Sequence, residues 1–563
     1  MSLPNKFTFR SLLENSNRLY QDLPALSYVD EKALTYGEVN KLATNLSDSL
    51  AAKGIKKGDR VAILSQNMPN WGVAYLAITR MGAVVVPILV DFSNPEIEKI
   101  LGHSEAKVIL VSEKMVDKLH QPLPQTLKSA FLIDDLGEIS VSDLEIRGKA
   151  VKCNGKINNL PPKSYEPEEN DLAAILYTSG TTGSPKGVML SHGNIISSAV
   201  NTLGIQDVNT KDRLLSVLPL PHTYECTIGF VIPFMRGATV YYLDKLPTPT
   251  VLLPAMEKVK PTMMLTVPLI IEKVYQNKVL PKLTGSAFMR SMMKVKTLRK
   301  FLHKMAGKKI YKAFGGHLHF FGIGGAKLGA PAELFLRDAG FPYAIGYGLT
   351  ETSPLLAGCN PKLTRYRSTG FCLPNQQLKI NNPDPKTGEG EILAKGPNVM
   401  MGYYKDEEQT QQVFTPDGWF KTGDLGVMDN DGYLYIRGRL KNMILSPSGE
   451  NIYPEDIEAV LNSQQYVQES LVYEMKGKLI AKVHLNYEEL EKKYQHLKAT
   501  ARNFQEELQQ KARERLHEIR EKANANLSRF SRLNTVEEQT VPFEKTPTKK
   551  IKRFLYFKSM EEN

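Results

Sequence analysis

The segment YTSGTTGSPKGV, from Tyr177 to Val188, gathers hydroxyl side chains, glycines and one lysine in a single short stretch. Hydroxyl groups donate hydrogen bonds to phosphate oxygens, glycines let the backbone approach a ligand closely, and lysine adds a positive charge. The residues that could contact a polyphosphate are Thr178, Ser179, Gly180, Thr181, Thr182, Gly183, Ser184, Lys186 and Gly187. An apolar run over 171–177 precedes the segment and a helical pattern follows from His192, so we expect a strand-to-helix connection that can bind an anion.

A P-loop nucleoside triphosphatase is the obvious alternative. Its motif places lysine directly before a hydroxyl residue that holds magnesium. Here Lys186 is followed by Gly187, and the hydroxyl residues precede the lysine. The spacing excludes the P-loop motif but still suits a polyphosphate.

In this order of residues, the segment resembles the phosphate-binding signature of the adenylate-forming superfamily, which includes acyl-CoA synthetases, luciferases and peptide-synthetase adenylation domains. Further segments resemble other motifs of the superfamily and follow in the same order. They are Gly324-Gly325-Ala326, Gly346-Tyr347-Gly348-Leu349-Thr350-Glu351-Thr352, Thr422-Gly423-Asp424 and Gly438-Arg439. The resemblance extends from Phe9 to Phe557, which is nearly the whole chain.

The resemblance implies how these motifs bind ATP and Mg²⁺. Glu351 would hold the metal, Asp424 the ribose hydroxyls, and Arg439 would also reach the nucleotide. The residues expected to face the adenine and the adenylate are Gly324, Gly325, Ala326, Gly346, Tyr347, Gly348 and Thr350. Without the resemblance, Asp424 could be an ordinary hairpin residue.

The implied reaction explains why these residue types are needed. A carboxylate must attack the α-phosphate of ATP, so two anions approach each other, and fixed donors and a metal offset their repulsion. Thr181 and Thr182 would bind phosphate oxygens.

The family also uses a lysine near the C-terminus, close to the bridging oxygen. The tail TPTKKIKR places Lys550 at the matching position, three residues before Arg553. This chain departs from the family at Lys549, where glycine is usual, and Lys552 is also close in sequence. A plain basic tail is the alternative interpretation.

His222, in LPLPHTYE, corresponds to the family's wall of the carboxylate site, although an ordinary partly buried histidine would have the same local sequence. Relatives that activate amino acids place an aspartate just after the aromatic residue of this motif. Here the first carboxylate is Glu225, three residues after His222. The sequence therefore favours a substrate with an uncharged tail.

The family uses one site for adenylation and then thioester formation, by rotating a C-terminal domain. We expect an AMP-binding domain over 1–438 and a lid domain over 439–563, with the hinge near Lys441. Gly449 would lie where the pantetheine arm of coenzyme A enters. A charged residue at Lys441 could otherwise be a simple linker residue.

The stretch SGENIYPEDIE and the basic insert before His319 resemble those of the long-chain fatty acyl-CoA ligases. We therefore expect ATP-dependent activation of a medium- or long-chain fatty acid to acyl-AMP, followed by thioester formation with coenzyme A. The alternatives are an enzyme that uses an acyl carrier protein or stops at the adenylate, a luciferase-type oxidation, and a catalytically idle membrane-associated lipid-binding protein.

These residues need a scaffold that brings them together, and the chain predicts one. Short apolar runs alternate with helical patterns, which indicates an α/β fold with largely parallel sheets. We expect strands at 60–64, 84–90, 108–111, 130–133, 213–218, 239–243, 263–267 and 319–323, and a helix at 70–81. From Gln377 the pattern changes to hairpins, one over 378–396 and one around 429–432, which indicates a β-rich subdomain.

The last part of the chain predicts a small α+β domain. A helix should begin at Pro454 and a hairpin should turn at 476–478. A long charged helix then carries one apolar stripe, at Phe504, Leu508, Ala512, Leu516, Ile519, Ala523 and Leu527. Such a stripe more often packs on its own domain than in a coiled-coil dimer.

The net charge of +12 is local rather than global. No acidic residue lies between Glu272 and Glu333, a window with 13 lysines and arginines, so the remainder of the chain carries a net charge of −1. Within this window, Lys278–Lys312 is the part expected to contact a membrane. Apolar residues from Met289 to Met305 interleave with the bases, which predicts an amphipathic helix. It suits an anionic membrane surface or, alternatively, a solvated helix packed on the domain.

Nucleic-acid binding is not expected, because no recognisable reading module accompanies the patch. The four cysteines do not have the spacing of a metal site, and the chain has no apolar stretch typical of a signal peptide or a membrane-spanning helix. We therefore expect a cytoplasmic protein, with peripheral contact with the inner face of the membrane as a further expectation.

Overall fold

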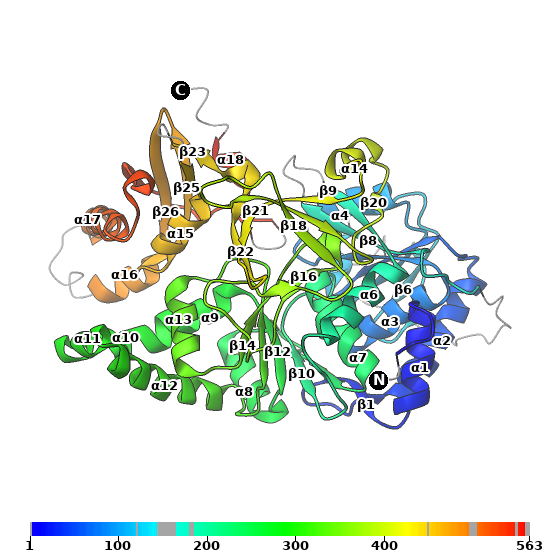
Figure 1. Cartoon of the computed structure of the whole chain (residues 1–563). Helices are drawn as coiled ribbons and strands as arrows, with labels where there is room; N and C mark the ends of the chain where they lie inside the picture. Colours follow the sequence, from blue (N-terminus) through cyan, green and yellow to red (C-terminus); the bar gives the residue numbers. More distant parts are fainter. Residues whose placement is uncertain are drawn as a thin grey trace.

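The computed structural model describes residues 3–119, 122–141, 144, 165–179, 185–446, 450–494, 504–546 and 550–557. Two large sheets and a β-rich region form a large unit, and the last part of the chain forms a smaller unit at one end of it (Figure 1). The functional motifs lie mainly on loops and strands between these parts.

An eight-stranded sheet carries the phosphate-binding segment. Its strands in spatial order are β20 (Gly402–Tyr403), β9 (Pro185–Ser191), β8 (Leu172–Ser179), β4 (Val84–Ile88), β3 (Arg60–Leu64), β5 (Val108–Val111), β6 (Ser129–Leu132) and β7 (Gly137–Ile139). From β8 to β6 the neighbours pair in parallel, with α3 (Pro69–Arg80) and α4 (Asn94–Ser104) between consecutive strands. The predicted strands of this half and the predicted helix at 70–81 are confirmed.

The predicted strand-to-helix connection at the phosphate-binding segment is wrong. The chain passes from β8 into β9, and the two strands pair antiparallel with Tyr177 opposite Gly187. α6 (His192–Leu203) begins only after β9, with Ser191 as its N-cap. The segment therefore connects two strands, because pairing along β8 satisfies the backbone groups of Lys186 to Ser191 before the helix can start.

A seven-stranded sheet forms the other half of the large unit. Its strands in spatial order are β14 (Tyr343–Ile345), β13 (Phe320–Ile323), β12 (Met263–Thr266), β10 (Arg213–Ser216), β11 (Thr239–Tyr242), β1 (Pro24–Tyr28) and β2 (Leu34–Thr35). All neighbours except β1 and β2 pair in parallel. The predicted strands between 213 and 323 are thus confirmed.

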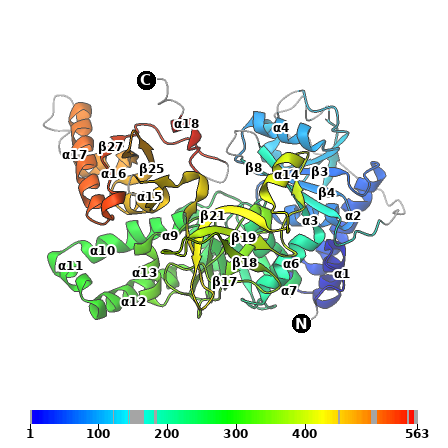
Figure 2. The same cartoon turned by 45° about the horizontal axis from the view of Figure 1, so that its top comes forward.

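Along the chain, helices precede the strands of this sheet or lie between them. They are α1 (Phe9–Tyr20), α2 (Tyr36–Ala52), α7 (Ile232–Arg236), α8 (Pro249–Val259), α9 (Pro268–Val274), α10 (Leu280–Thr284), α11 (Ala287–Lys294), α12 (Lys296–Ala313) and α13 (Ala330–Ala339). The predicted amphipathic helix is therefore divided into α11 and α12, which project at one end of the molecule (Figures 1 and 2).

An aromatic core joins α3 to the π-helical segment η2 (Tyr224–Val231). The Trp71 ring stacks on Tyr75 with centroids 5.2 Å apart, and Phe230 meets Trp71 edge-on at 6.2 Å. All three side chains are buried. Because large aromatic side chains contribute much buried apolar area, this packing fixes the segment that follows His222.

The β-rich region consists of two small antiparallel sheets and one helix. Its elements are β15 (Tyr347–Gly348), β16 (Leu355–Gly358), β17 (Phe371–Cys372), β18 (Gln377–Asn381), β19 (Gly390–Lys395), α14 (Glu407–Val413), β21 (Phe420–Met428) and β22 (Leu434–Arg439). β18 pairs with β19, and β21 with β22, so both predicted hairpins are confirmed.

The smaller unit has its own core. Its elements are β23 (Ile444–Leu445), β24 (Asn451–Ile452), α15 (Pro454–Asn462), β25 (Val467–Met475), β26 (Lys478–Leu485), α16 (Tyr487–Tyr494), α17 (Phe504–Asn524), β27 (Thr535–Glu538) and α18 (Phe554–Phe557). The stripe from Leu508 to Ala523 on α17 is buried against this unit, as predicted for a helix that packs on its own domain. The domain boundary at 438/439 stays a prediction; β22 ends at Arg439, and the short turn Leu440–Asn442 follows.

In the part of the chain that the structure describes, no helix combines the length and the apolar character needed to cross a bilayer.

Candidate active site

Asp424 is buried and has two polar partners. The Tyr347 hydroxyl donates to Asp424 Oδ2 at 2.8 Å, and the Arg439 guanidinium contacts Oδ1 at 2.8 Å. β21 and β22 hold the two partners together, because Asp424 is directly opposite Arg439 in their register. Burial raises the pKa of the Asp424 carboxyl, while Arg439, Tyr347 and Lys550 act in the opposite direction.

Glu351 lies on the loop that leaves β15, in a short turn at Thr350–Thr352. The Tyr403 hydroxyl of β20 donates to Glu351 Oε1 at 3.0 Å. This loop folds tightly: a Cβ on Gly348 would lie 1.9 Å from the Pro354 carbonyl oxygen, so any side chain there would displace the backbone. The sequence GLTET therefore places Glu351 at a fixed position beside β20.

Lys550 approaches these residues from the smaller unit. Its backbone forms a tight hairpin with Thr546, whose N–H donates to the Lys550 carbonyl at 2.7 Å. Lys550 as a whole is an exposed residue. Protein atoms nevertheless surround its ammonium group closely, and the resulting desolvation lowers the pKa of Lys550. Arg439 lowers that pKa further, whereas Asp424 and Glu351 raise it, so the four charges occupy one neighbourhood.

His222 is the next member of the group. Burial and, to a smaller extent, the positive charge of Lys550 together lower its pKa to about 4. Its Nδ1 accepts from the Tyr224 backbone N–H at 3.2 Å. The imidazole is therefore neutral at neutral pH, which allows it to border an anionic group without forming a fixed ion pair.

The motif that is expected to face the adenine lies directly beside the His222 segment. A Cβ on Gly324 would lie 3.2 Å from the Tyr224 ring, so glycine leaves room for the aromatic ring to contact the backbone. Gly325 has a positive φ of 83° and lies in the loop that follows β13. A flat ligand could lie on such a surface of exposed backbone and aromatic ring.

Lys186 of β9 points toward β20 and α14. Its ammonium group contacts Gln409 and lies 5.7 Å from the centroid of the Tyr403 ring. Burial lowers the pKa of Lys186, as does the positive charge of Lys441. The expected phosphate-binding lysine and the expected hinge residue are thus electrostatic neighbours.

Several predicted site residues cannot be placed. Gly180, Thr181, Thr182, Gly183 and Gly449 lie outside the described residues. Thr178 and Ser179 form the end of β8, and for Ser179 the structure describes the backbone only.

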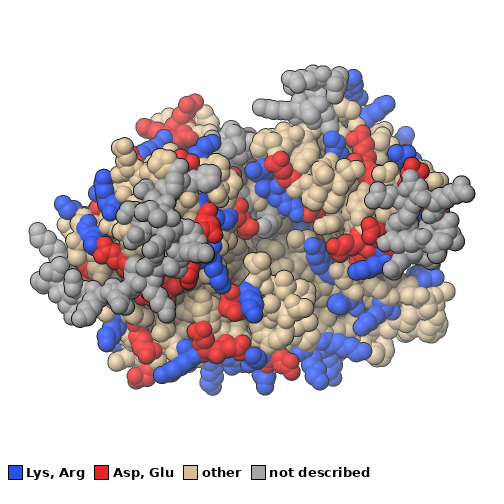
Figure 3. All heavy atoms as spheres, turned by 180° about the vertical axis from the view of Figure 1, so that it is seen from behind, with Lys and Arg blue, Asp and Glu red and all other residues tan. Residues whose placement is uncertain are grey.

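The predicted residues connected by the contacts and charges described above come from both units. In Figure 2, α18 of the smaller unit lies above and to the left of β21, and β8 of the large unit lies above and to its right. Lys552 of the smaller unit approaches α4, with its Nζ 4.0 Å from Glu96 Oε1. Figure 3 shows a hollow near the middle of the rear face of the molecule.

Tyr403, Gln409 and Tyr224 also contact the site residues, although they were not predicted from the sequence. Tyr403 contacts Glu351 from 52 residues away, and Gln409 contacts Lys186 from 223 residues away. No local pattern marks such residues, because β20 reaches the site only by pairing with β9.

The donor set fits a magnesium–nucleotide complex. Three cations (Lys186, Arg439 and Lys550) face two carboxylates, which suits a polyphosphate that brings its own metal. Among the described residues no group of three or more potential metal ligands occurs. Glu351 would therefore hold Mg²⁺ together with phosphate oxygens rather than within a closed protein cage.

Comparison with known proteins decides the family. The family described as AMP-binding enzyme matches residues 13–404, which is more than half of the chain. The chain belongs to this family. It is an adenylate-forming enzyme that resembles the long-chain acyl-CoA synthetases, as the sequence motifs predicted.

Two relatives and one solved structure illustrate the similarity. The chain is 30% identical over 493 residues to the putative acyl-CoA synthetase YngI of Bacillus subtilis, covering 81% of this chain and 82% of the relative. It is 30% identical over 448 residues to the long-chain-fatty-acid–CoA ligase FadD15 of Mycobacterium bovis, covering 75% and 72%. The o-succinylbenzoate CoA synthetase of B. subtilis with ATP and magnesium has a TM-score of 0.73 and 24% identity, covering 96% and 98%. The predicted fold of this adenylate-forming enzyme is confirmed.

Proposed function

We propose that this AMP-binding enzyme activates a medium- or long-chain fatty acid with ATP and then transfers the acyl group to coenzyme A. The observation that carries the proposal is the convergence of Lys550 with Asp424, Glu351 and His222. The first residue comes from the smaller unit and the other three from the large unit. A reaction between two anions needs this arrangement of fixed charges.

Each residue has a distinct part in the proposed reaction. Asp424, held by Tyr347 and Arg439, would accept hydrogen bonds from the ribose hydroxyls. Glu351 would hold Mg²⁺, which supplies positive charge at the phosphates when it is bound. Lys550 would stabilise negative charge on the bridging oxygen as the carboxylate attacks the α-phosphate.

The proposed products follow from this attack. The bond between the carboxylate oxygen and the α-phosphorus forms, pyrophosphate leaves, and the acyl-AMP is the first product. The thiol of coenzyme A then attacks the acyl carbon, loses its proton, and releases AMP. The hinge at Lys441 and pantetheine entry near Gly449 belong to this proposal, since the second step needs a different position of the smaller unit.

Two observations favour a fatty acid. The relatives named above include a long-chain-fatty-acid–CoA ligase. Glu225, the first carboxyl after His222, is buried with a pKa raised to about 8, so it provides no fixed charge for an α-ammonium group at neutral pH. An acyl carrier protein as the acceptor is the alternative to coenzyme A, and the substrate panel below distinguishes the two.

A substrate panel tests the overall proposal. Pyrophosphate release would be measured with Mg-ATP and acetate, octanoate, palmitate, oleate, benzoate or mixed amino acids, each with and without coenzyme A. We expect acyl-CoA from the longer fatty acids only. Persistence of acyl-AMP in the presence of coenzyme A would favour a carrier protein or an enzyme that stops at the adenylate, and absence of pyrophosphate with every acid would favour the idle lipid-binding alternative.

Lys550→Ala tests the assignment of the catalytic lysine. Loss of one charge that stabilises the transition state should slow adenylation by about 100-fold or more, while thioester formation from preformed acyl-AMP changes little. The matched control is Lys552→Ala, which removes a neighbouring lysine that faces Glu96 instead. If Lys550→Ala adenylates normally, the assignment is wrong.

A further inference from the structure

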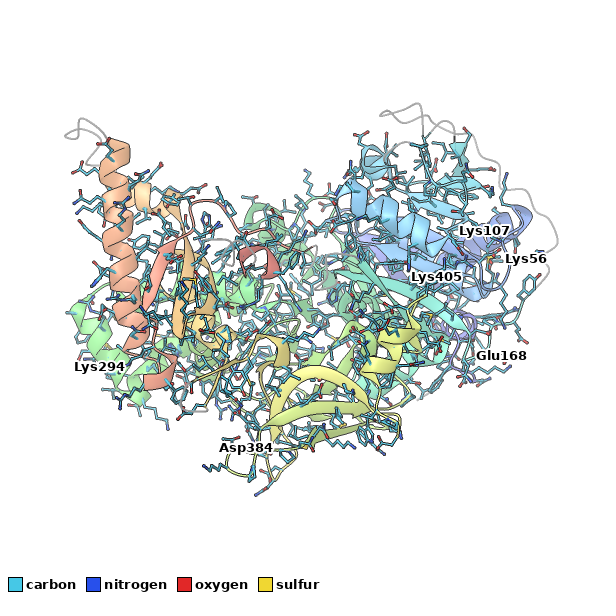
Figure 4. All side chains as sticks on the ribbon, turned by 90° about the horizontal axis from the view of Figure 1, so that it is seen from above. Lys56, Lys107, Glu168, Lys294, Asp384 and Lys405 are labelled. Carbon is cyan, nitrogen blue, oxygen red and sulfur yellow. The ribbon has the colours of Figure 1, made fainter. Side chains whose placement is uncertain are left out.

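The exposed side chains of α11 and α12 are unusually apolar. Phe288 is 71% exposed, Phe301 59% and Met305 51%, and Val295 and Leu298 are also exposed. These residues lie on neighbouring helices at one end of the molecule, where the stick view labels Lys294 at the outer edge (Figure 4). The surface of a soluble protein seldom carries several large apolar side chains next to one another.

α12 has two different faces. Its inner face packs on the domain through His303, Gly307 and Ile310, which are buried, and a Cβ on Gly307 would lie 2.5 Å from the Cβ of Ala339 on α13. Its outer stripe carries Leu298, Phe301 and Met305, at spacings that share one side of a helix. The amphipathic pattern of the sequence is therefore divided, since one apolar side covers the core and the other faces outward.

Lysines border the outer stripe. Lys304, Lys308 and Lys312 follow one another at four-residue spacing and are exposed. Within the described chain none of these lysines has a carboxylate within ion-pair distance, whereas Arg299 on the inner side pairs with Asp338 at 2.9 Å. Figure 3 shows blue basic side chains beside uncharged ones at this end of the molecule, at the lower right of the view.

We propose that α11 and α12 dock on an anionic lipid surface, with Phe288, Phe301 and Met305 entering the boundary between headgroups and acyl chains. Apolar side chains flanked by unpaired lysines are the combination that an amphipathic helix uses to lie in a membrane interface. No acidic residue lies between Glu272 and Glu333, so this window carries no negative charge that would repel anionic headgroups.

An acidic protein or a nucleic acid is less well matched to this face. Both would engage the lysines, but neither accounts for two exposed phenylalanines and a methionine on a projecting surface. The lipid surface accounts for the charge and for the apolar side chains together. The docking proposal goes beyond the proposed function and stands without it, because binding is measured with no substrate present.

Vesicle flotation of the full chain tests the docking. We expect binding to vesicles of phosphatidylcholine with about one-third phosphatidylglycerol, weak binding to phosphatidylcholine alone, and weakening by salt, because the electrostatic part is screened. The double variant Phe288→Ser/Phe301→Ser and the triple variant Lys304→Gln/Lys308→Gln/Lys312→Gln should each reduce partitioning by about tenfold or more.

Matched controls change the same chemistry elsewhere. Leu246→Ser/Val541→Ser removes two other exposed apolar side chains, and Lys386→Gln/Lys476→Gln/Lys522→Gln removes three other exposed lysines. These variants should float like the parent chain. Pyrophosphate release with octanoate, a soluble acid, should be the same for all of them and for the docking variants, which shows that each variant is folded.

Three results would overturn the docking proposal. They are absence of binding to anionic vesicles, equal loss of binding in the control variants, and capture of a purified acyl carrier protein or an oligonucleotide with no vesicle binding. Failure of pyrophosphate release by the parent chain would instead contradict the proposed function and leave the flotation result intact.

Discussion

Glu225 is a buried carboxyl group in the segment that also carries His222. The Ser216 hydroxyl donates to Glu225 Oε1 at 2.6 Å, and among the described residues Oε2 has no hydrogen-bond partner. Burial raises the Glu225 pKa from 4.5 to about 8, so the native protein holds this proton where an unfolded chain would release it. The residue is neutral through most of the physiological pH range.

Glu225→Gln should therefore change how stability depends on pH. Between pH 4.5 and about 8 the native state binds more protons at this site than the unfolded state, so stability falls as pH rises through that window. The full effect is at most about 5 kcal/mol, since one pKa unit corresponds to about 1.4 kcal/mol. Glutamine keeps an amide in place of the neutral acid and removes the ionisation.

The measurement is the Tm of both proteins at pH 6 and pH 9. The parent Tm should fall between these values by about 2 °C more than the Tm of Glu225→Gln. Glu488→Gln, which makes the same change at an exposed position of α16, should behave like the parent. Parallel Tm curves for the parent and Glu225→Gln would show that Glu225 ionises in the native protein at its ordinary pH.

Residues that act within a local motif could be predicted from the sequence, and residues recruited by long-range pairing could not. Asp424 lies in TGD and Glu351 in GLTET, so each was identified from its neighbours. Tyr403 was not, because its contact with Glu351 depends on the pairing of β20 with β9. Sequence spacing carries no information on such a pair.

At the scale of elements, short apolar runs predicted the parallel strands well, because strands buried on both faces leave a continuous hydrophobic signal. The same reasoning failed at β9, which begins with Pro185 and Lys186 and pairs antiparallel with β8. β9 is a strand because it pairs with β8, and its composition alone does not predict a strand. The helical pattern from His192 was correctly identified, because α6 begins there, but the strand β9 that precedes it was missed.

α15 is the element that joins the smaller unit to the adenine-facing loop. Lys327 Nζ lies 2.5 Å from Asp456 Oδ1, and the Gln276 side-chain amide donates to the Asn462 carbonyl at 2.6 Å. Lys327 directly follows Ala326 of that loop. These contacts hold the arrangement in which Lys550 meets Asp424, and a rotation of the smaller unit would break them.

Asp456→Asn should shift the balance between the two proposed half-reactions. A partly exposed ion pair contributes up to about 1 kcal/mol, so adenylation should slow by about two- to fivefold, while thioester formation from preformed acyl-AMP stays unchanged or becomes faster. Both rates would be measured separately. Glu514→Gln, which breaks the Lys511–Glu514 pair on α17, is the control and should alter neither rate. Equal slowing of both half-reactions by Asp456→Asn would exclude a role in holding the adenylation arrangement.

At the scale of the whole molecule, the proposed site combines residues of both units. Asp424, Glu351 and His222 are fixed within the large unit, whereas Lys550 comes from a hairpin close to the end of the chain. The sequence predicted both sets from their motifs, but their mutual placement depends on contacts such as Lys327–Asp456, which pair residues 129 positions apart.

Lys441→Pro tests whether the two proposed half-reactions need two arrangements of the molecule. Lys441 is the second residue of the turn Leu440–Asn442, and proline would fix φ at this residue near the value of a 3₁₀ turn. Proline should therefore preserve the arrangement seen here and resist any rotation that changes φ at the hinge. Adenylation should stay within about threefold of the parent rate, and acyl-CoA formation should fall by about tenfold or more.

Lys441→Ala separates the backbone effect from the loss of charge near Lys186, whose pKa the Lys441 charge lowers. It should keep both half-reactions close to the parent rates, since alanine leaves φ free. Single-turnover measurement of acyl-AMP formation and of its consumption by coenzyme A distinguishes the cases. If Lys441→Pro forms acyl-CoA at the parent rate, the smaller unit does not turn at this residue, and the thiol must reach the adenylate in the arrangement described here.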